Sequence, residues 1–329
     1  MKKLTILVVG GCGYIGTHMV KALLDAGHDV VTLDNLSRGN RELLPGGAFV
    51  LGDITDRVVL EQVFTAHDFD AVMHFAAFTE VGESVLDPLK YYQNNVVGTL
   101  TLLKAMLRHK VDKFIFSSSA AVYGEPDETP IVEAHPCRPT SPYGWTKLMV
   151  ESVLQDYDRA YGLKSMALRY FNAAGADASG AIGERHDPES HLIPLVLKVA
   201  TGERDNITIF GTDHATPDGT CVRDYIHVND LVAAHLLALE ALQDGAPSAA
   251  YNLGNSKGLS VREVIDTARR ITGHPIPAVE GPKRPGDPAV LVAASDKARN
   301  ELGWKPKFET LDVIIESAWN WHRSPKANS

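Results

Sequence analysis

The chain has 329 residues, more than one hydrophobic core usually organises, so we expect one large domain with a smaller one attached. Apolar residues make up 44% and charged residues 22%, values that exclude a disordered or fibrous protein. Acidic residues outnumber basic ones by 41 to 32, and the net charge of −9 argues against nucleic acid or an anionic membrane as the main partner. Cys12, Cys137 and Cys221 form no paired motif, so neither a disulfide framework nor a metal site is predicted, and a cytoplasmic location is expected.

The N-terminal segment MKKLTILVVGG begins like a signal peptide, with two lysines followed by an apolar run. Glycines end that run almost at once, so the segment is better explained as a buried strand. No uninterrupted stretch of about 18 apolar residues follows, and the sequence therefore predicts no membrane-spanning helix.

Predicted strands and helices alternate through the first half of the chain. The strands are short apolar runs, as expected for strands covered on both faces, and the helices have apolar residues at helical spacing. In chain order the elements are a strand at Thr5–Val9, a helix at His18–Ala26, strands at Asp29–Leu33, Ala48–Leu51 and Ala71–Ala76, a helix at Thr99–His109, a strand at Phe114–Phe116, a helix at Tyr143–Tyr161 and a strand at Lys164–Tyr170. This alternation predicts an α/β fold with a doubly wound parallel sheet of the Rossmann type.

The composition changes after Phe171. Residues 172–190 are rich in Gly, Ala and Asp and lack periodicity, which predicts a long loop of the kind that carries function. Shorter mixed elements follow, namely a strand at Ile207–Phe210 and helices at Val232–Leu242, Val261–Ile271 and Leu311–His322. We therefore expect a Rossmann domain over residues 1–170 and a smaller mixed α/β domain over residues 171–329, with some segments of the second packing back on the first.

Three glycines, Gly10, Gly13 and Gly16, lie between the first predicted strand and helix. Glycine is required where the turn is tight, where backbone approaches a pyrophosphate, and where the helix packs on the strand. The phosphates then lie at a helix N-terminus, where free N–H groups favour negative charge. Asp34 ends the second predicted strand, where its carboxylate can accept both ribose hydroxyls and repel a 2′-phosphate. The combination predicts a dinucleotide site that prefers NAD to NADP.

Tyr143 and Lys147 lie four residues apart at the start of a predicted helix, a spacing that places them on one face. A free tyrosine ionises near pH 10, but a nearby ammonium group and the positive nicotinamide of oxidised NAD stabilise the phenolate. A phenolate whose pKa matches the ambient pH is a good general base. Ser119, which follows the fifth predicted strand, can hydrogen-bond the same substrate oxygen. These three residues predict redox chemistry at a substrate hydroxyl.

With these features the chain resembles the extended short-chain dehydrogenase/reductase family, and within it the 4-epimerases of UDP-hexoses. The resemblance runs from Leu4 to about His322. Its motifs are GGCGYIG at 10–16, LDN at 33–35, GDI at 52–54, HFAA at 74–77, VGES at 81–84, YYQNNVVGT at 91–99, FSSSAAVYG at 116–124, SPYGWTK at 141–147, LRYFNAAGA at 168–176, VRDYIHVND at 222–230 and RPGDPA at 284–289.

The resemblance implies roles for individual residues. Ser119, Tyr143 and Lys147 would be catalytic, and no metal is implied. NAD would contact Gly10, Gly13, Tyr14, Ile15, Gly16, Asp34, Asn35, Leu36, Ser37, Gly39, Asp53, Ile54, Phe75, Ala76, Ala77, Asn94, Ser119, Tyr143, Lys147 and Phe171. The nucleotide sugar would contact Ser119, Tyr143, Asn172, His191, Leu192, Arg223, Arg284 and Asp287. Two arginines in this set offer bidentate donors to a pyrophosphate.

The activity implied by the resemblance is interconversion of UDP-glucose and UDP-galactose at C4 through a 4-keto sugar, by a homodimer with tightly bound NAD. Sugar-nucleotide dehydratases share the first step but need an acid and a base after the serine run, where this chain has Ala120 and Ala121. UDP-N-acetylglucosamine and UDP-glucuronate remain alternative substrates, and a non-catalytic NAD sensor is a further alternative. No hydrolase elbow, HExxH or P-loop motif is found.

Three positions depart from the pattern of some relatives. Thr79 stands where some have a lysine near the cofactor, and His191 stands where some have an asparagine on the nucleotide. Leu291 stands where some have a tyrosine that borders the sugar pocket. A smaller residue leaves more room there, so an N-acetylated hexose is a further candidate substrate.

Overall fold

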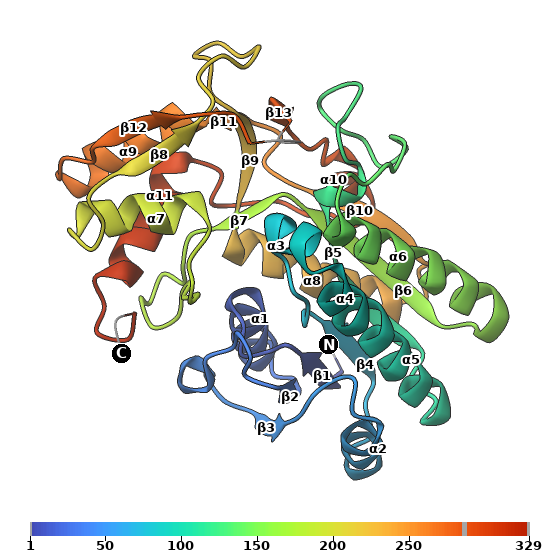
Figure 1. Ribbon diagram of the computed structural model, residues 1–329. Coiled ribbons are helices and arrows are strands. Elements are labelled where there is room, and N and C mark those ends of the chain that lie inside the picture. The colour runs from blue at the N-terminus through green and yellow to red at the C-terminus, as the bar shows by residue number, and fades with distance from the viewer. Residues whose placement is uncertain (1, 285–287, 328–329) are drawn as a thin grey trace.

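The computed structural model describes residues 2–284 and 288–327, and a seven-stranded sheet organises its first half (Figure 1). The strand order is β10-β6-β5-β4-β1-β2-β3, and every neighbouring pair is parallel. The strands are β1 (Thr5–Val9), β2 (Asp29–Asp34), β3 (Ala48–Leu51), β4 (Ala71–His74), β5 (Lys113–Ser119), β6 (Lys164–Tyr170) and β10 (Ala249–Leu253). The predicted doubly wound parallel sheet is confirmed.

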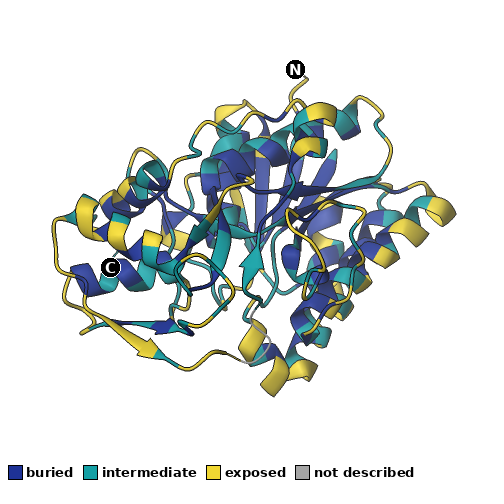
Figure 2. Cartoon of the chain, turned by 90° about the horizontal axis from the view of Figure 1, so that it is seen from above, coloured by how far each residue is buried: buried dark blue, intermediate teal, exposed yellow. Residues whose placement is uncertain are grey.

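Helices cover both faces of this sheet, so its central strands are buried (Figure 2). Residues of β1 alternate between the two faces: Ile6 and Val8 pack with α1 (Tyr14–Asp25) and α8 (Val228–Gln243), whereas Leu7 and Val9 pack with the other layer. That layer consists of α2 (Arg57–Ala66), α5 (Thr99–Arg108) and α6 (Pro142–Tyr161). Burial on both faces explains why β1 is a continuous apolar run.

Several boundaries differ from the predicted ones. The helix expected at His18–Ala26 begins at Tyr14, because Gly13 is its N-cap. The strand expected at Ala71–Ala76 ends at His74, and β5 runs from Lys113 to Ser119. Short elements fill the connections: η1 (Arg41–Leu43), α3 (Val81–Leu86), α4 (Pro88–Tyr91), the π-helical turn η2 (Tyr92–Gly98) and η3 (Ala120–Val122).

The second half of the chain forms smaller sheets with their own helices (Figure 1). In one sheet the order is β11-β9-β13, with β7 paired to β9; in the other, β8 pairs with β12. Its elements are β7 (Asn172–Ala174), α7 (Leu192–Ala200), β8 (Ile207–Phe210), β9 (Val222–His227), β11 (Gly258–Ser260), α9 (Val261–Thr272), β12 (Ala278–Gly281), β13 (Val290–Leu291), α10 (Asp296–Glu301) and α11 (Leu311–His322). Helices α7, α9 and α11 share a separate hydrophobic core with β8.

Two elements from the second half of the chain pack with the seven-stranded sheet of the first half. Strand β10 forms the edge of the seven-stranded sheet beside β6, and α8 packs against α1. Residues of both lie in the same hydrophobic core as β1. In the described part of the chain, no helix combines the length and the apolar character needed to cross a membrane.

Candidate active site

The turn after β1 can only be made by glycine at two positions. Gly10 has φ +79°, and a Cβ atom on it would lie 2.5 Å from the backbone nitrogen of Ala76. A Cβ atom on Gly16 would lie 2.1 Å from the carbonyl oxygen of Gly10. Neither distance is compatible with a side chain, so the turn holds α1 close against β1 and β4.

The N-terminus of α1 offers an anion site. Gly13 is the N-cap and has no side chain to accept a hydrogen bond from the first turn, and that turn contains no acidic residue. The first N–H groups of a helix have no partner within it, and the helix dipole adds partial positive charge there. This end of α1 therefore fits the pyrophosphate of a dinucleotide, as the sequence predicts for Tyr14 and Ile15.

Asp34, the last residue of β2, is held in place by backbone groups. Its Oδ2 accepts a hydrogen bond from the Cys12 N–H at 2.9 Å, and its Oδ1 accepts one from the Leu36 N–H at 2.8 Å. A Cβ atom on Gly39 would lie 2.8 Å from Oδ1, so only glycine leaves the carboxylate room there. Burial raises the pKa of Asp34, although these N–H donors oppose the shift. The carboxylate thus sits beside the glycine turn.

The carboxyl end of β3 meets the loop that follows β2. The Asn35 side-chain amide donates to Oδ2 of Asp53 at 2.7 Å, and the Asn35 Oδ1 accepts from the Ser37 N–H at 2.9 Å. Thr55 donates its N–H and its hydroxyl to Asp53 Oδ1 at 2.8 and 2.6 Å. Next to this carboxylate, Ile54 is buried in the core. The predicted residues of both loops therefore lie side by side.

Small residues follow β4 at the same edge of the sheet. The N–H groups of Phe75 and Ala76 both donate to the carbonyl oxygen of Val9, at 2.8 and 3.1 Å. These two hydrogen bonds hold the segment that follows β4 against the glycine turn. Ala77 continues the segment with a side chain that occupies little space.

Asn94 lies in the π-helical turn η2, and its neighbour ties that turn to α6. The Asn94 side-chain amide donates to Oδ1 of Asn95 at 2.9 Å. Asn95 in turn donates to the Thr146 hydroxyl at 3.2 Å and to the Phe78 carbonyl oxygen at 3.0 Å. Thr146 precedes Lys147 directly, so these bonds link Asn94 to the helix that carries Tyr143 and Lys147.

Ser119, Tyr143 and Lys147 come together at the end of β5. Ser119 ends that strand, and its hydroxyl is near enough to Tyr143 to lower the pKa of the phenol. Helix α6 begins at Pro142, where Ser141 caps it by accepting from the Gly144 N–H at 3.2 Å. Lys147, one turn later, lies with its Nζ 5.8 Å from the centre of the Tyr143 ring. The predicted spacing thus brings the hydroxyl, the phenol and the ammonium group together.

The side chains of the site are buried, and burial dominates their electrostatics. Tyr143 and Lys147 are only 8% and 3% exposed. Burial raises the pKa of Tyr143, against a smaller lowering effect of the Ser119 hydrogen bond. Burial lowers the pKa of Lys147 to about 7, against the attraction of Glu151. The protein side chains alone therefore do not produce a phenolate at neutral pH, and a further positive charge at the site is needed.

Lys147 is fixed by the strand beneath it. Its Nζ donates to the carbonyl oxygen of Ser117 at 2.7 Å and lies 4.9 Å from the centre of the Phe116 ring. Both residues belong to β5, which also ends in Ser119. Strand β5 therefore positions the ammonium group and the serine hydroxyl together.

A buried ion pair beneath the site is not among the residues predicted from the sequence. Glu151, one turn after Lys147 on α6, accepts from Arg169 of β6 at 2.9 Å and from the Ser118 hydroxyl at 2.5 Å. Arg169 also donates to the Tyr123 hydroxyl at 2.8 Å. The sequence does contain one signal for this ion pair: Glu151 follows Lys147 at helical spacing, which places it on the buried face of the same helix.

The predicted sugar-nucleotide residues lie on the elements of the second half. Asn172 begins β7 directly after Phe171, and Arg223 lies on β9 opposite Leu291 of β13. Arg284 is exposed, and its guanidinium carbon lies 3.9 Å from the centre of the Phe210 ring at the end of β8. Asp287 lies outside the described residues.

His191 is the N-cap of α7, and Leu192 is the first residue of that helix. The Nδ1 atom of His191 forms a short hydrogen bond with Glu184. The pKa of His191 is raised: burial would lower it, but Glu184 and Glu189 outweigh burial. The two glutamates therefore favour the protonated form of His191, at the N-terminus of α7.

The predicted cofactor residues share one location. They end or follow one of the strands β1 to β6, apart from Asn94 on η2 and the pair on α6. Because the carboxyl ends of parallel strands meet at one edge of the sheet, these residues lie along that edge. The smaller sheet with β7 and β9 begins where β6 ends, at Asn172.

Comparison with known proteins agrees with this geometry. A model of the NAD dependent epimerase/dehydratase family matches residues 6–254. The UDP-glucose 4-epimerase of Halalkalibacterium halodurans is 55% identical over 320 residues, which cover 97% of this chain and 96% of that protein.

Solved structures show the same likeness. The UDP-glucose 4-epimerase of Brucella ovis in complex with NAD is 47% identical, with a TM-score of 0.94 over 96% of this chain and 97% of that one. The enzyme of Bifidobacterium longum in complex with NAD+ and UDP is 42% identical, with a TM-score of 0.95 over 99% of this chain and 100% of that one. The fold and the family expected from the motifs are thus confirmed, and the chain belongs to the NAD dependent epimerase/dehydratase family.

Proposed function

We propose that this protein is an NAD-dependent isomerase that interconverts UDP-glucose and UDP-galactose at C4. The observation that carries the proposal is the buried group of Ser119, Tyr143 and Lys147 beside the glycine turn. Full-length similarity to UDP-glucose 4-epimerases supports the choice of substrate.

Residues 1–170 provide the NAD site in this proposal, and residues 171–329 provide the site for the nucleotide sugar. From the second part, β10 completes the first sheet and α8 packs against it. The N-terminus of α1 binds the pyrophosphate of NAD, and Asp34 accepts the ribose hydroxyls. On the sugar side, Arg223 and Arg284 donate to the diphosphate, with Asn172, His191, Leu192 and Asp287 as further contacts.

The chain's own residues handle the proton. Tyr143 Oη accepts the proton of the sugar 4-hydroxyl, and the Ser119 hydroxyl hydrogen-bonds the same oxygen. Lys147 supplies positive charge beside the phenolate. Bound NAD supplies the acceptor and then the donor of the hydride at C4. Because affinity is concentrated in the nucleotide, the hexose can turn and present its other face before Tyr143 returns the proton.

Elimination of water is not supported by the site. A dehydratase needs an acid and a base at C5 and C6 of the sugar, and the residues that follow Ser119 are Ala120 and Ala121. Neither side chain can transfer a proton, which favours epimerisation.

The protein is also proposed to be a cytoplasmic homodimer. Its three cysteines are free thiols, two of them buried, as expected in a reducing compartment. Large apolar side chains are exposed on neighbouring elements, with Leu86 on α3 at 86%, Val97 on η2 at 41% and Met149 on α6 at 40%. Covering such an apolar face with a second copy would remove it from water.

The test is incubation of the purified protein with UDP-galactose and no added cofactor, with the formation of UDP-glucose followed by chromatography. We expect conversion, because tightly bound NAD is carried through purification. Absence of conversion even after NAD⁺ is supplied would refute the proposal. Parallel incubations with UDP-N-acetylgalactosamine and UDP-glucuronate define the sugar range. The N-acetylated sugar is included because Leu291 is smaller than tyrosine and leaves room for an N-acetyl group.

A further inference from the structure

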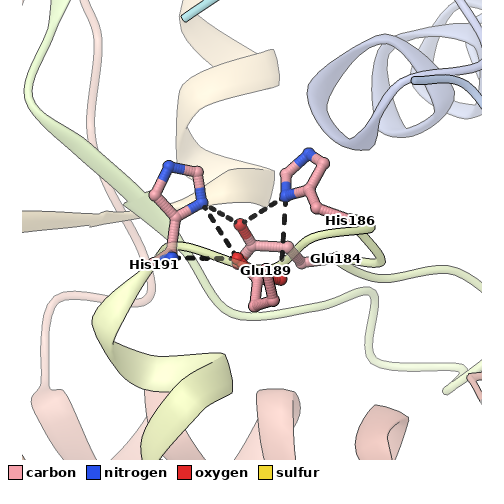
Figure 3. A group of neighbouring side chains, drawn as sticks. All are labelled: Glu184, His186, Glu189 and His191. Atoms are coloured by element: carbon pink, nitrogen blue, oxygen red, sulfur yellow. Dashed lines mark hydrogen bonds and ion pairs between the residues drawn. The ribbon is translucent and has the colours of Figure 1, made fainter. Parts of the chain in front are cut away.

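The loop between β7 and α7 gathers four side chains that can bind a metal ion. Glu184, His186, Glu189 and His191 each offer one ligand atom, and these atoms all lie within 4.8 Å of one another. In Figure 3 the two imidazole rings lie on opposite sides of the two carboxylates. The cysteines of the sequence predict no metal site. In this loop, however, glutamate and histidine residues that lie close in the sequence bring two nitrogen and two oxygen donors together.

The spacing of the donor atoms fits a tetrahedral ion. The Nδ1 atom of His186 lies 3.3 Å from Glu184 Oε1 and 3.7 Å from Glu189 Oε2. The Nδ1 atom of His191 lies 3.7 Å from Glu189 Oε1. Ligands at about 2.05 Å from a tetrahedral zinc ion are separated by about 3.3 Å. The two imidazoles lie nearest to different oxygens of Glu189, of which one would be the ligand. For all four residues to reach one ion, the short hydrogen bond between His191 and Glu184 must lengthen, and the wider separations, all within 4.8 Å, must shorten.

Burial and charge also favour a cation here. The side chains of Glu184 and Glu189 are only 6% and 3% exposed, so two shielded carboxylates require a positive partner. One divalent ion carries the charge that balances these two carboxylates.

We propose that Glu184, His186, Glu189 and His191 form a binding site for a divalent transition-metal ion, with zinc as the best fit. Zinc takes four nitrogen and oxygen ligands without a preferred d-electron geometry, and a set with no open position is typical of a structural ion. The ion therefore holds the loop in place and takes no part in the reaction. The four residues are outside the proton-handling group, and only His191, which would offer Nδ1 to the ion, is also a proposed contact of the nucleotide sugar.

The loop is well placed for such an ion to connect distant parts of the fold. The Tyr14 hydroxyl of α1 donates to the Gly175 carbonyl oxygen at 2.6 Å, and Arg38 donates to the Asp187 carbonyl oxygen at 2.7 Å. The indole N–H of Trp321 on α11 donates to the Glu184 carbonyl oxygen at 2.8 Å. An ion at the four side chains would fasten the glycine-turn helix and α11 to the start of α7.

The test is titration of Zn²⁺ into full-length protein that has been dialysed against a chelator and then against metal-free buffer. Calorimetry is expected to give one ion per chain, and bound zinc is expected to raise the melting temperature. His186→Gln and Glu189→Gln are each expected to weaken binding by at least about tenfold. The matched control is His109→Gln. His109 lies 3.0 Å from Glu61, but among the described residues this pair belongs to no group of three or more possible ligands, so the substitution should leave zinc binding unchanged.

Binding at less than one ion per chain, or equal binding by wild type and both loop variants, overturns the proposal. The unaltered protein provides a second measurement that does not depend on the folding of any variant. Co²⁺ bound at a four-coordinate site gives intense visible absorption, whereas Co²⁺ that keeps its water ligands gives weak absorption. Absence of the intense bands on adding one equivalent of Co²⁺ would also overturn the proposal. Neither measurement requires UDP-galactose turnover, so its outcome is independent of the epimerase assay.

Discussion

Tyr143 is nearly inaccessible to water, and burial raises the pKa of its phenol above the ordinary value. Removal of the hydroxyl in Tyr143→Phe keeps the ring packing but removes the proton acceptor. We expect kcat for UDP-galactose to fall by about 10²- to 10⁴-fold, with little change in UDP affinity by calorimetry. The control is Tyr161→Phe, at the exposed end of the same helix, which should leave kcat unchanged. Turnover of Tyr143→Phe at the wild-type rate would remove Tyr143 from its proposed role.

Lys147 makes the stability of the cofactor-free protein depend on pH. Its pKa in the folded chain is about 7, lowered by burial from the ordinary value of 10.5. Below pH 7 the lysine is charged in both the folded and the unfolded state, and the full cost of burying the charge is present. As pH rises above 7, Lys147 loses its proton in the folded state but keeps it in the unfolded state. The folded state is therefore stabilised relative to the unfolded state, until the pH reaches the pKa of the unfolded lysine.

We therefore expect the free energy of unfolding of wild type, relative to Lys147→Met, to increase between pH 7 and pH 9. The slope is at most about 1.4 kcal/mol per pH unit. Urea unfolding at three pH values measures it, and the other titrating groups cancel in the difference between the two proteins. Lys104→Met, at an exposed position of α5, is the control and should show no such slope. A flat difference for Lys147→Met would mean that Lys147 stays charged when buried.

The residues of the site differ in how far sequence could predict them. Tyr143 and Lys147 lie on one helix, so their spacing alone places them together, and the structure agrees. The pair of Glu151 and Arg169 joins α6 to β6, and only the packing of the helix on the sheet decides that they meet. The same applies to Glu184 and His191, which meet through the path of an irregular loop.

At the scale of elements, the junction of β1 and α1 depends on the absence of a side chain at Gly16. In Gly16→Ala the new Cβ would lie 2.1 Å from a backbone oxygen, which a shift of a side chain cannot relieve. We expect a loss of about 1–3 kcal/mol in stability and loss of NAD from the purified protein. Absorbance and mass spectrometry of the released cofactor, together with thermal unfolding, measure both effects.

Gly82→Ala in α3 is the matched control for that substitution. A Cβ atom there would have no neighbour within 4 Å, and alanine is the better helix former. Its NAD content and melting temperature should therefore equal or exceed those of wild type. If Gly16→Ala retained NAD as well as this control does, the close packing of the turn would not be what the cofactor site requires.

Elements with local signals are the ones that sequence could predict. The strands β1, β3, β6 and β8 and the helix α11 have the predicted bounds, because each is a clear apolar run or periodic segment. Helix α7 is absent from the predicted elements: it starts directly after the long loop, and most of its residues are apolar, which conceals the helical period. Short strands such as β9 and β13 acquire their partners only through the tertiary fold.

At the scale of the whole molecule, the order of strands in the main sheet is the least predictable feature. The segment AAYNL of β10 carries no signal that distinguishes an edge of the first sheet from a strand of the second half. It pairs with β6 after some 80 intervening residues, and Tyr251 and Leu253 bury themselves in the core shared by α1 and α8. Long-range burial of this kind decides topology, and no periodic pattern within five residues can specify it.

The proposed association of two chains belongs to the same scale. Leu100 on α5 and Met149 on α6 are 37% and 40% exposed, and η2 packs between these helices with Val97 exposed as well. Large apolar side chains exposed on neighbouring elements are costly in water, and in the proposed homodimer a second copy would cover them. Replacing Leu100 and Met149 by glutamate would place two like charges from each chain in the contact, which strongly disfavours pairing.

We therefore expect the double variant Leu100→Glu/Met149→Glu to elute as a single chain at micromolar concentration, whereas the wild type elutes with twice that mass in light-scattering chromatography. The control is Val58→Glu on α2, where the apolar side chain is 65% exposed on a different helix. Since that helix is not part of the proposed contact, the control should remain dimeric. A wild type with the mass of one chain, or a dimeric double variant, would show that this apolar face does not join two copies.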